Sequence, residues 1–175
     1  MTIQEKQSME IRKACLDHIP EILQVYDIAR AYMRANGNFS QWGGGYPGAA
    51  LLEADIQSGN LYVMCLGDVI EGVFALIFGE DPTYKYIENG SWHSSRPYGT
   101  IHRLASRGNV RGIARACFDY CLGKTQYLRI DTHEDNRPMQ QTLERFGFQK
   151  CGTIYLADGA PRIAFDYIIQ GQQSE

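Results

Sequence analysis

The sequence lacks a long hydrophobic run and a strong excess of charge of either sign. No apolar stretch among its 175 residues approaches the roughly 20 residues of a membrane-spanning helix. Residues 1–10 are polar and include Glu5, Lys6 and Glu10, so the apolar centre of a signal peptide is also missing. The net charge of −3 provides no basic footprint for nucleic acid. These absences predict a cytoplasmic protein with neither a nucleic-acid nor a membrane partner.

The five cysteines do not form the pattern of a disulfide framework. Their odd number and apolar surroundings favour reduced, buried thiols. Cys117 and Cys121 lie one helical turn apart and could in principle ligate a metal, but no C-x-x-C pair or nearby histidine completes a site. We therefore expect no metal.

Repeats, low-complexity tracts and the two common nucleotide-binding fingerprints are also missing. Neither the G-x-G-x-x-G of a Rossmann fold nor the G-x-x-x-x-G-K-[ST] of a P-loop occurs. The hydrophobic fraction of 44% and the charged fraction of 21% are those of a globular protein. The length predicts a single domain over residues 1–175, with a core from about residue 9 to about residue 170.

Hydrophobic periodicity predicts a mixture of strands and helices. Strands are expected over 10–14, 61–66, 69–78, from 101, and over 126–133, 149–156 and 163–168, and helices over about 18–35, 49–58, from 109–114 to 122, and from Asn136 or Arg137 to Phe146. The segment from Gly79 to Gly99 is irregular and rich in aromatic residues. Such a loop could wall a binding site or cover an exposed sheet edge.

The stretch from Ile101 to Cys121 has the pattern of a strand, a glycine-bearing turn and an amphipathic helix. A helix N-terminus presents unpaired N–H groups and favours a phosphate or carboxylate. Gly112 allows close approach to the backbone, and arginines 107, 111 and 115 add positive charge. The turn is therefore typical of an anion cradle. Alternatively, Gly112 and Ala114 only permit close packing, and the arginines are solvated.

Two motifs resemble those of the GNAT superfamily of acyl-CoA-dependent N-acyltransferases. The first, Asn109-Val110-Arg111-Gly112-Ile113-Ala114, resembles the pyrophosphate loop Q/R-x-x-G-x-G/A, with Asn109 in place of Gln or Arg. The second runs from Asn136 to Gly147-Phe148 and resembles N-x-x-A-x-x-L-Y-E-K-x-G-F. The expected order of elements is also the GNAT order. The resemblance implies an α/β fold with a mixed, mostly antiparallel sheet of about seven strands, about four flanking helices and a splayed central strand pair.

The resemblance also implies acetyl-CoA as co-substrate and assigns residues to it. Leu104, Ala105 and Ser106 would pair with the pantetheine arm as an added strand would. The pyrophosphate would be held by the backbone of Asn109, Val110, Arg111, Gly112, Ile113 and Ala114, with the side chains of Arg111 and Arg115. Asn136 would hydrogen-bond the arm from the other side of the gap.

The implied chemistry is direct attack of a neutral amine on the acetyl thioester, which requires a base, a polarising strand N–H and a proton for the thiolate. Leu143 replaces the tyrosine that often serves as the acid, and Tyr155 is a possible substitute. For the base we consider His102 on the central strand, His133 with Asp131 and Asp135 nearby, or water.

The acceptor site is expected between the loop after the first helix and the loop before the central strand. Trp42, Tyr46, Trp92 and Tyr98 would line it and favour a small amine with an apolar or cationic body. Alternatively, Trp42 and Tyr46 simply fill the core. We expect an N-acetyltransferase acting on a primary amine, as a monomer or homodimer. The alternatives are a non-catalytic acyl-CoA-binding or sensor module and a nucleotide-binding α/β protein.

Overall fold

The computed structural model describes residues 8–170 and contains the predicted order of elements. The elements are β1 (Glu10–Lys13), α1 (Ile19–Ala35), α2 (Ala49–Gln57), β2 (Leu61–Leu66), β3 (Val69–Phe78), β4 (Gly99–Ser106), α3 (Ile113–Leu122), β5 (Tyr127–Thr132), α4 (Arg137–Phe146), β6 (Gln149–Tyr155) and β7 (Pro161–Ile168). Short 3-10 turns occupy Leu16–His18 and Pro82–Tyr84. Within residues 8–170, no helix combines the length and hydropathy of a membrane span.

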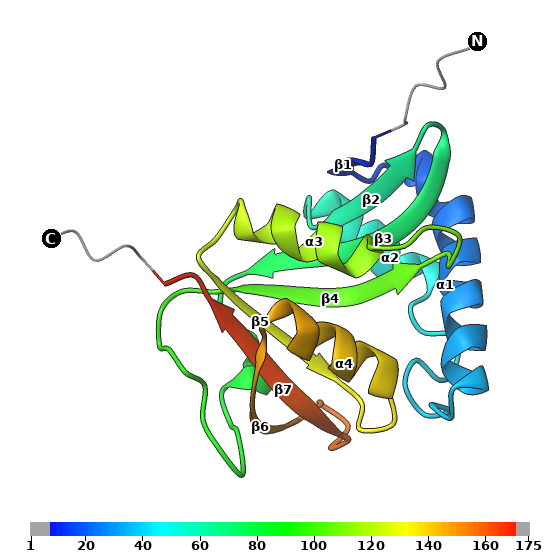
Figure 1. Cartoon of the computed structure of the whole chain (residues 1–175). Coiled ribbons are helices and arrows are strands. Elements are labelled where there is room, and N and C mark those ends of the chain that lie inside the picture. The colour runs from blue at the N-terminus through cyan, green and yellow to red at the C-terminus, as the bar shows by residue number, and fades with distance from the viewer. Residues whose placement is uncertain (1–7, 171–175) are drawn as a thin grey trace, which may run out of the picture.

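All seven strands form one open sheet in the order β1-β2-β3-β4-β5-β7-β6. Every neighbouring pair is antiparallel except β4 and β5. These two strands pair only at Gly99 with Leu128 and at Thr100 with Arg129. Beyond this point they diverge, as Figure 1 shows, which confirms the predicted mixed sheet with a splayed central pair.

Helices cover both faces of the sheet because the strands bury side chains on both sides. One core cluster joins α1 and α2 to the sheet through residues such as Ile22, Leu52 and Val73. A second cluster joins α3 and α4 to the sheet through Phe118 and Leu143. A third lies under the long segment between β3 and β4. The strands of the centre are therefore fixed from both faces, and the opening between β4 and β5 is held by packed elements.

The long segment between β3 and β4 is ordered by specific contacts with the β6–β7 side of the sheet. Glu88 and Thr153 exchange two backbone hydrogen bonds of 2.8 Å, which form an isolated bridge to β6. The guanidinium of Arg129 lies 4.1 Å from the ring centre of Trp92 and 4.0 Å from that of Tyr98. The segment thus covers part of the sheet, and Asp81 and Thr83 near its start line a cavity.

Candidate active site

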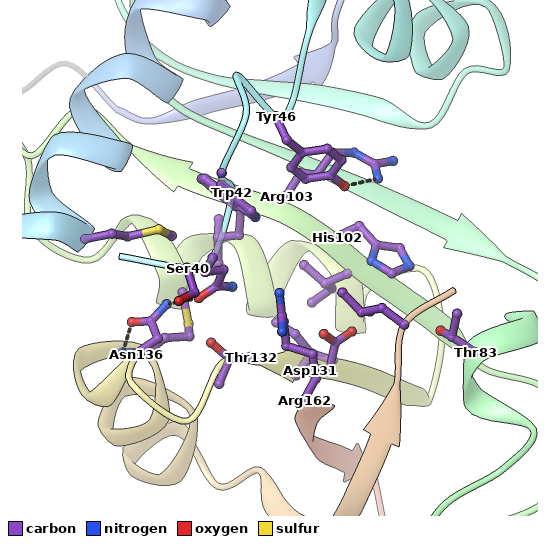
Figure 2. A pocket seen from close by; sticks show the side chains of 18 of the residues that line it. Ser40, Trp42, Tyr46, Thr83, His102, Arg103, Asp131, Thr132, Asn136 and Arg162 are labelled. Carbon is purple, nitrogen blue, oxygen red and sulfur yellow. Dashed lines mark hydrogen bonds between the residues drawn. The ribbon is translucent and has the colours of Figure 1, made fainter. Parts of the chain in front are cut away.

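A cavity of about 800 Å³ lies where β4 and β5 diverge (Figure 2). Its walls come from both strands, the loop after α1, the loop after β3, the start of α4 and the β6–β7 turn. The lining residues include Gln41, Trp42, Tyr46, Asp81, Thr83, His102, Arg103, Leu104, Asp131, Thr132, Asn136, Met139, Leu156, Asp158 and Arg162. Five stretches of the chain that lie apart in the sequence therefore meet where β4 and β5 separate.

A bulge in β4 forms one wall of the cavity. Arg103 and Leu104 together stand opposite Phe74, because the ladder with β3 shifts register between Val73 and Ala75. Arg103 has a φ of 55°, a left-handed conformation that is uncommon for a residue with a side chain. A bulge interrupts the regular ladder and re-aims side chains, so backbone groups of β4 are available here.

Buried polar contacts fix the bulge. The guanidinium of Arg103 lies 2.7 Å from the carboxylate of Asp55 and donates to the Tyr46 hydroxyl at 3.1 Å. The Tyr26 hydroxyl donates to the Arg103 carbonyl at 2.8 Å, and burial raises the pKa of Tyr26 well above its usual range. The left-handed residue is thus held by three partners, from α1, from α2 and from the loop between these two helices.

His102 and Asp81 form a hydrogen-bonded pair in the cavity. The distance between His102 Nε2 and Asp81 Oδ2 is 2.9 Å. Asp81 also accepts from the backbone and hydroxyl of Thr83, at 2.9 and 2.7 Å. Burial alone would raise the pKa of Asp81, but the hydrogen bonds from His102 and Thr83 outweigh it and lower the pKa to about 2. Asp81 is therefore a carboxylate at neutral pH and orients the imidazole.

A second carboxyl group, Asp131, faces the same space from β5, as Figure 2 shows. The Tyr84 hydroxyl donates to it at 2.6 Å. Burial raises the pKa of Asp131, although His102, Tyr84 and Arg162 act in the opposite direction. The environments of Asp81 and Asp131 thus shift their pKa values apart, as is common where protons are exchanged.

Gln41 ties the loop after α1 to the start of α4. Its side-chain oxygen accepts from Asn136 Nδ2 at 3.0 Å and from Asn38 Nδ2 at 2.9 Å. Asn136 Oδ1 accepts from the Met139 N–H at 3.2 Å, which makes Asn136 the N-cap of α4. Asn136 lines the cavity, but its amide N–H is engaged with Gln41.

Of the four aromatic residues predicted to line the acceptor site, two lie in the wall of this cavity. Trp42 and Tyr46 line the cavity, and Trp42 also packs edge-on against Tyr26 at 5.5 Å. Trp92 and Tyr98 do not line it, which corrects the prediction. They stack on Arg129 instead, because this buried cation needs aromatic faces and polar partners. Tyr98 contributes indirectly, because its hydroxyl accepts from the Asp81 N–H at 2.8 Å.

Two of the three predicted catalytic residues, His133 and Tyr155, lie outside the lining of the cavity. His133 Nδ1 accepts from the Asp135 N–H at 3.0 Å in the turn before α4. The Tyr155 hydroxyl donates to Glu88 at 2.5 Å, on the side of β6 that faces the long segment. Of the three, the structure brings only His102 into the cavity.

The loop before α3, predicted to be an anion cradle, ends in a left-handed glycine. Gly112 has a φ of 84° and is the N-cap of α3, with no side chain capping the helix. A Cβ on Gly112 would meet nothing within 4 Å, so the space beside it is open. The helix begins at Ile113, within the range predicted for its start, because the left-handed Gly112 ends the loop. Arg107 is not part of the cradle, since it binds Glu21 and the Ile70 carbonyl.

Backbone groups and exposed arginines are what this loop offers a ligand. Val110 and Ile113 pack into the core beneath α3, while Arg111 and Arg115 are exposed. On the preceding strand, Leu104 lines the cavity and Ala105 packs toward α1 and α2.

Sequence reasoning missed several polar residues of the cavity. Asp81, Thr83, Asp158 and Arg162 carry no motif, and each reaches the cavity from a loop or a strand end. Asp81 precedes Pro82 and the 3-10 turn that it caps, so an N-cap pattern was the available signal. That signal indicates a turn and says nothing about the histidine 21 residues later that the turn faces.

Comparisons with known proteins agree with this architecture. Neither a family model nor a curated protein matches the sequence. A GNAT-family acetyltransferase from Streptococcus agalactiae superposes with a TM-score of 0.85 and is 32% identical, covering 94% of this chain and 98% of its own. A GNAT-family acetyltransferase from Listeria monocytogenes reaches a TM-score of 0.68 at 16% identity, covering 92% of this chain and 95% of its own.

A structure from Salmonella typhimurium, assigned as an acetyltransferase and solved with its cofactor acetyl-CoA, has a TM-score of 0.58. It is 14% identical, covers 95% of this chain and 96% of its own, and so shows the fold alone. The Streptococcus agalactiae structure is similar enough in sequence to show the family as well as the fold. Together with the splayed strands and the glycine loop, it establishes that the chain belongs to the GNAT family of acetyltransferases.

Proposed function

We propose that the protein transfers an acetyl group from acetyl-CoA to the primary amine of a small-molecule acceptor. The observation that carries the proposal is the His102–Asp81 pair, which faces a cavity at the opening between β4 and β5. A histidine held by an ionised carboxylate is a suitable general base near neutral pH.

The residues present fit the acetyl-CoA molecule. The uncapped N–H groups at the start of α3 and the open side of Gly112 suit a pyrophosphate, with Arg111 and Arg115 beside it. Between β4 and β5, the buried Thr132 hydroxyl has no partner within residues 8–170 and is available to an amide of the arm. The arm would also pair with the backbone of residues 104–106. Asn136 would give up its hydrogen bond to Gln41 and form one to the arm.

When bound, acetyl-CoA supplies the thioester whose carbonyl carbon forms the new C–N bond while the C–S bond breaks. Asp81 holds the Nε2–H of His102, so Nδ1 carries the lone pair that accepts the ammonium proton. A backbone N–H of the β4 bulge would polarise the carbonyl. Leu143 has no proton to give and Tyr155 binds Glu88, so the thiolate takes its proton from water.

The walls of the cavity favour a small amine with an apolar or cationic body. Trp42 and Tyr46 offer aromatic faces, and Asp81 and Asp131 add negative potential near His102. An ammonium group entering from solvent is attracted to these carboxylates, and His102 then removes its proton. The carboxylates thus attract the acceptor, while His102 prepares it for attack.

The test is release of free thiol from acetyl-CoA with a panel of small primary amines. We expect amine-dependent release, and His102→Gln lowers kcat by about 10²–10⁴ with little change in the KM for acetyl-CoA. The matched control is His133→Gln, which removes a histidine outside the cavity and leaves kcat unchanged. Loss of activity in His133→Gln but not in His102→Gln contradicts the assignment of the base. Binding of acetyl-CoA without turnover of any amine favours a non-catalytic module.

A further inference from the structure

A second cluster of reactive side chains lies outside the cavity, where the segment between β3 and β4 meets β6 and β7. His93 Nδ1 is 2.7 Å from Asp166 Oδ1 and 3.5 Å from Cys151 Sγ. One ligand atom from each of the three residues lies within 4.8 Å of the other two. Cys151 and Asp166 are buried, whereas the His93 side chain is 39% exposed. The group therefore opens to solvent on the His93 side.

The backbone around Cys151 is arranged to present the thiol. The ladder between β6 and β7 shifts register between Lys150 and Gly152, which makes Cys151 the extra residue of a bulge. The segment from β3 presses on this bulge so closely that a Cβ on Gly90 would lie 1.8 Å from the Cys151 carbonyl oxygen. The position of the thiol is thus fixed by backbone contacts and does not depend on a mobile loop.

Asp166 is oriented in the way that supporting hydrogen bonds orient a metal-binding carboxylate. Its Oδ2 accepts from the Tyr127 hydroxyl at 2.7 Å and from the His93 N–H at 2.9 Å. The Tyr127 hydroxyl is itself held by Arg129 Nε at 3.2 Å. These bonds occupy Oδ2, so Oδ1 is the atom directed at His93 Nδ1 and Cys151.

We propose that Cys151 Sγ, His93 Nδ1 and Asp166 Oδ1 bind one zinc-class divalent cation, with a water molecule as the fourth ligand. Thiolate and imidazole select such a cation over magnesium or calcium, which prefer oxygen ligands. Bonds of about 2.0–2.3 Å at tetrahedral angles place the nitrogen and sulfur about 3.5 Å apart, which is the separation observed. The distance between His93 Nδ1 and Asp166 Oδ1, now 2.7 Å, must increase by only about 0.6 Å.

Charge and protons balance in this site. Binding displaces the thiol proton of Cys151 to solvent, and the ring proton that His93 Nδ1 donates to Asp166 moves to Nε2, so that the neutral ring binds through Nδ1. A thiolate and a carboxylate together neutralise the two charges of the cation. Without metal, burial and the neighbouring Asp166 raise the pKa of Cys151, so the thiol is protonated. The cation therefore has to compete with one proton.

Metal at this position would join the segment between β3 and β4 to the β6–β7 hairpin. The neighbour of His93, Trp92, donates to the Tyr84 carbonyl at 2.9 Å, and Tyr84 in turn donates to Asp131 in the cavity. The same segment carries Asp81. The expected effect is a more stable segment. This inference does not rest on the proposed acetyl transfer.

The experiment uses the full chain, freed of any affinity tag and stripped with a chelator, and titrates it with Co²⁺ and then Zn²⁺. We expect one equivalent of Co²⁺ to give a sulfur-to-cobalt charge-transfer band that one equivalent of Zn²⁺ removes. Zn²⁺ also raises the unfolding midpoint, and Mg²⁺ does not. Cys151→Ser abolishes the band, and the exposed His93→Gln, which should fold normally, weakens binding at least tenfold.

The matched control is Cys15→Ser. Cys15 Sγ also lies 3.5 Å from a histidine nitrogen, His18 Nδ1, but no third ligand joins this exposed pair among residues 8–170. Cys15→Ser should leave the band unchanged. The proposal is overturned if no band forms, if the band is lost in Cys15→Ser and kept in Cys151→Ser, or if His93→Gln binds as the wild type does.

Discussion

Replacing Asp81 by Asn tests the electrostatics of the cavity, because it keeps the size of the side chain and its oxygen toward Thr83. The variant removes the negative charge against His102 and also the acceptor oxygen that faces His102 Nε2. The pKa of Asp81 is lowered from 3.8 to about 2, so its charge stabilises the folded state above the unfolded pKa. This contribution is lost as the pH falls from about 4 through about 2. At neutral pH the wild type should therefore be the more stable protein.

The size of the effect follows from the pKa shift. A pKa lowered from 3.8 to about 2 corresponds to about 2 kcal/mol, at 1.36 kcal/mol per pKa unit. Part of the shift comes from Thr83, whose hydrogen bonds survive in the variant, and the side chain is 17% exposed and partly screened. We expect Asp81→Asn to lower the free energy of unfolding by about 1–2 kcal/mol at pH 7.

Urea unfolding of wild type and variant at pH 7 and at stepwise lower pH measures this difference. The matched control is Asp131→Asn, which also removes one negative charge from the cavity. Burial raises the pKa of Asp131, so its charge costs stability at neutral pH, and the cost disappears below its unfolded pKa. Asp131→Asn should therefore be as stable as the wild type at pH 7, or more stable.

Three results would be inconsistent with these opposite effects of the two charges. One is an Asp81→Asn variant that unfolds at the wild-type urea concentration at pH 7. The second is an Asp131→Asn variant that loses as much stability as Asp81→Asn, since the two charges would then contribute alike. The third is a stability difference between wild type and Asp81→Asn that grows as the pH falls from 4 to 2, because it would have the wrong sign.

Two further substitutions test the cofactor loop and the core. Gly112→Asp places a negative charge and a strained side chain at the start of α3, so calorimetry should show acetyl-CoA binding weakened several-fold. The control is Gly159→Asp, because Gly159 has a φ of 86° and equally open surroundings. This control variant should bind acetyl-CoA normally. Equal binding by both variants would argue against the cradle. Leu143→Ala leaves a cavity beneath α4 and should cost about 2–5 kcal/mol in urea unfolding, whereas a loss under 1 kcal/mol would show that Leu143 is not core.

The elements could be predicted from the sequence because most of them bury one regular face. The helix at Arg137–Phe146, for example, has its N-cap at Asn136 and its C-cap at Gly147, as its sequence indicates. The divergence of β4 and β5 was different in kind. It depends on pairings between distant residues, and only the resemblance to the GNAT family predicted it.

The site was predictable only in part. His102 was identified because it lies on the central strand, but its partner Asp81 comes from a loop that only the fold brings alongside. The prediction for Trp92 and Tyr98 was wrong because an aromatic residue in a loop can face either a ligand or a buried cation. In this protein both rings face the cation of Arg129. Metal-ligand spacing likewise gave no sign of His93, Cys151 and Asp166, which lie far apart along the chain.

We expect the opening between β4 and β5, together with the loop before α3, to bind acetyl-CoA. The most direct test is the thermal unfolding midpoint of the protein with acetyl-CoA at about a hundred times its dissociation constant, which adds about 2.7 kcal/mol. For a chain of this length we expect a rise of about 5–11 °C with acetyl-CoA and none with ATP. An unchanged midpoint with acetyl-CoA, or an equal rise with ATP, would contradict selective binding of acetyl-CoA at this site.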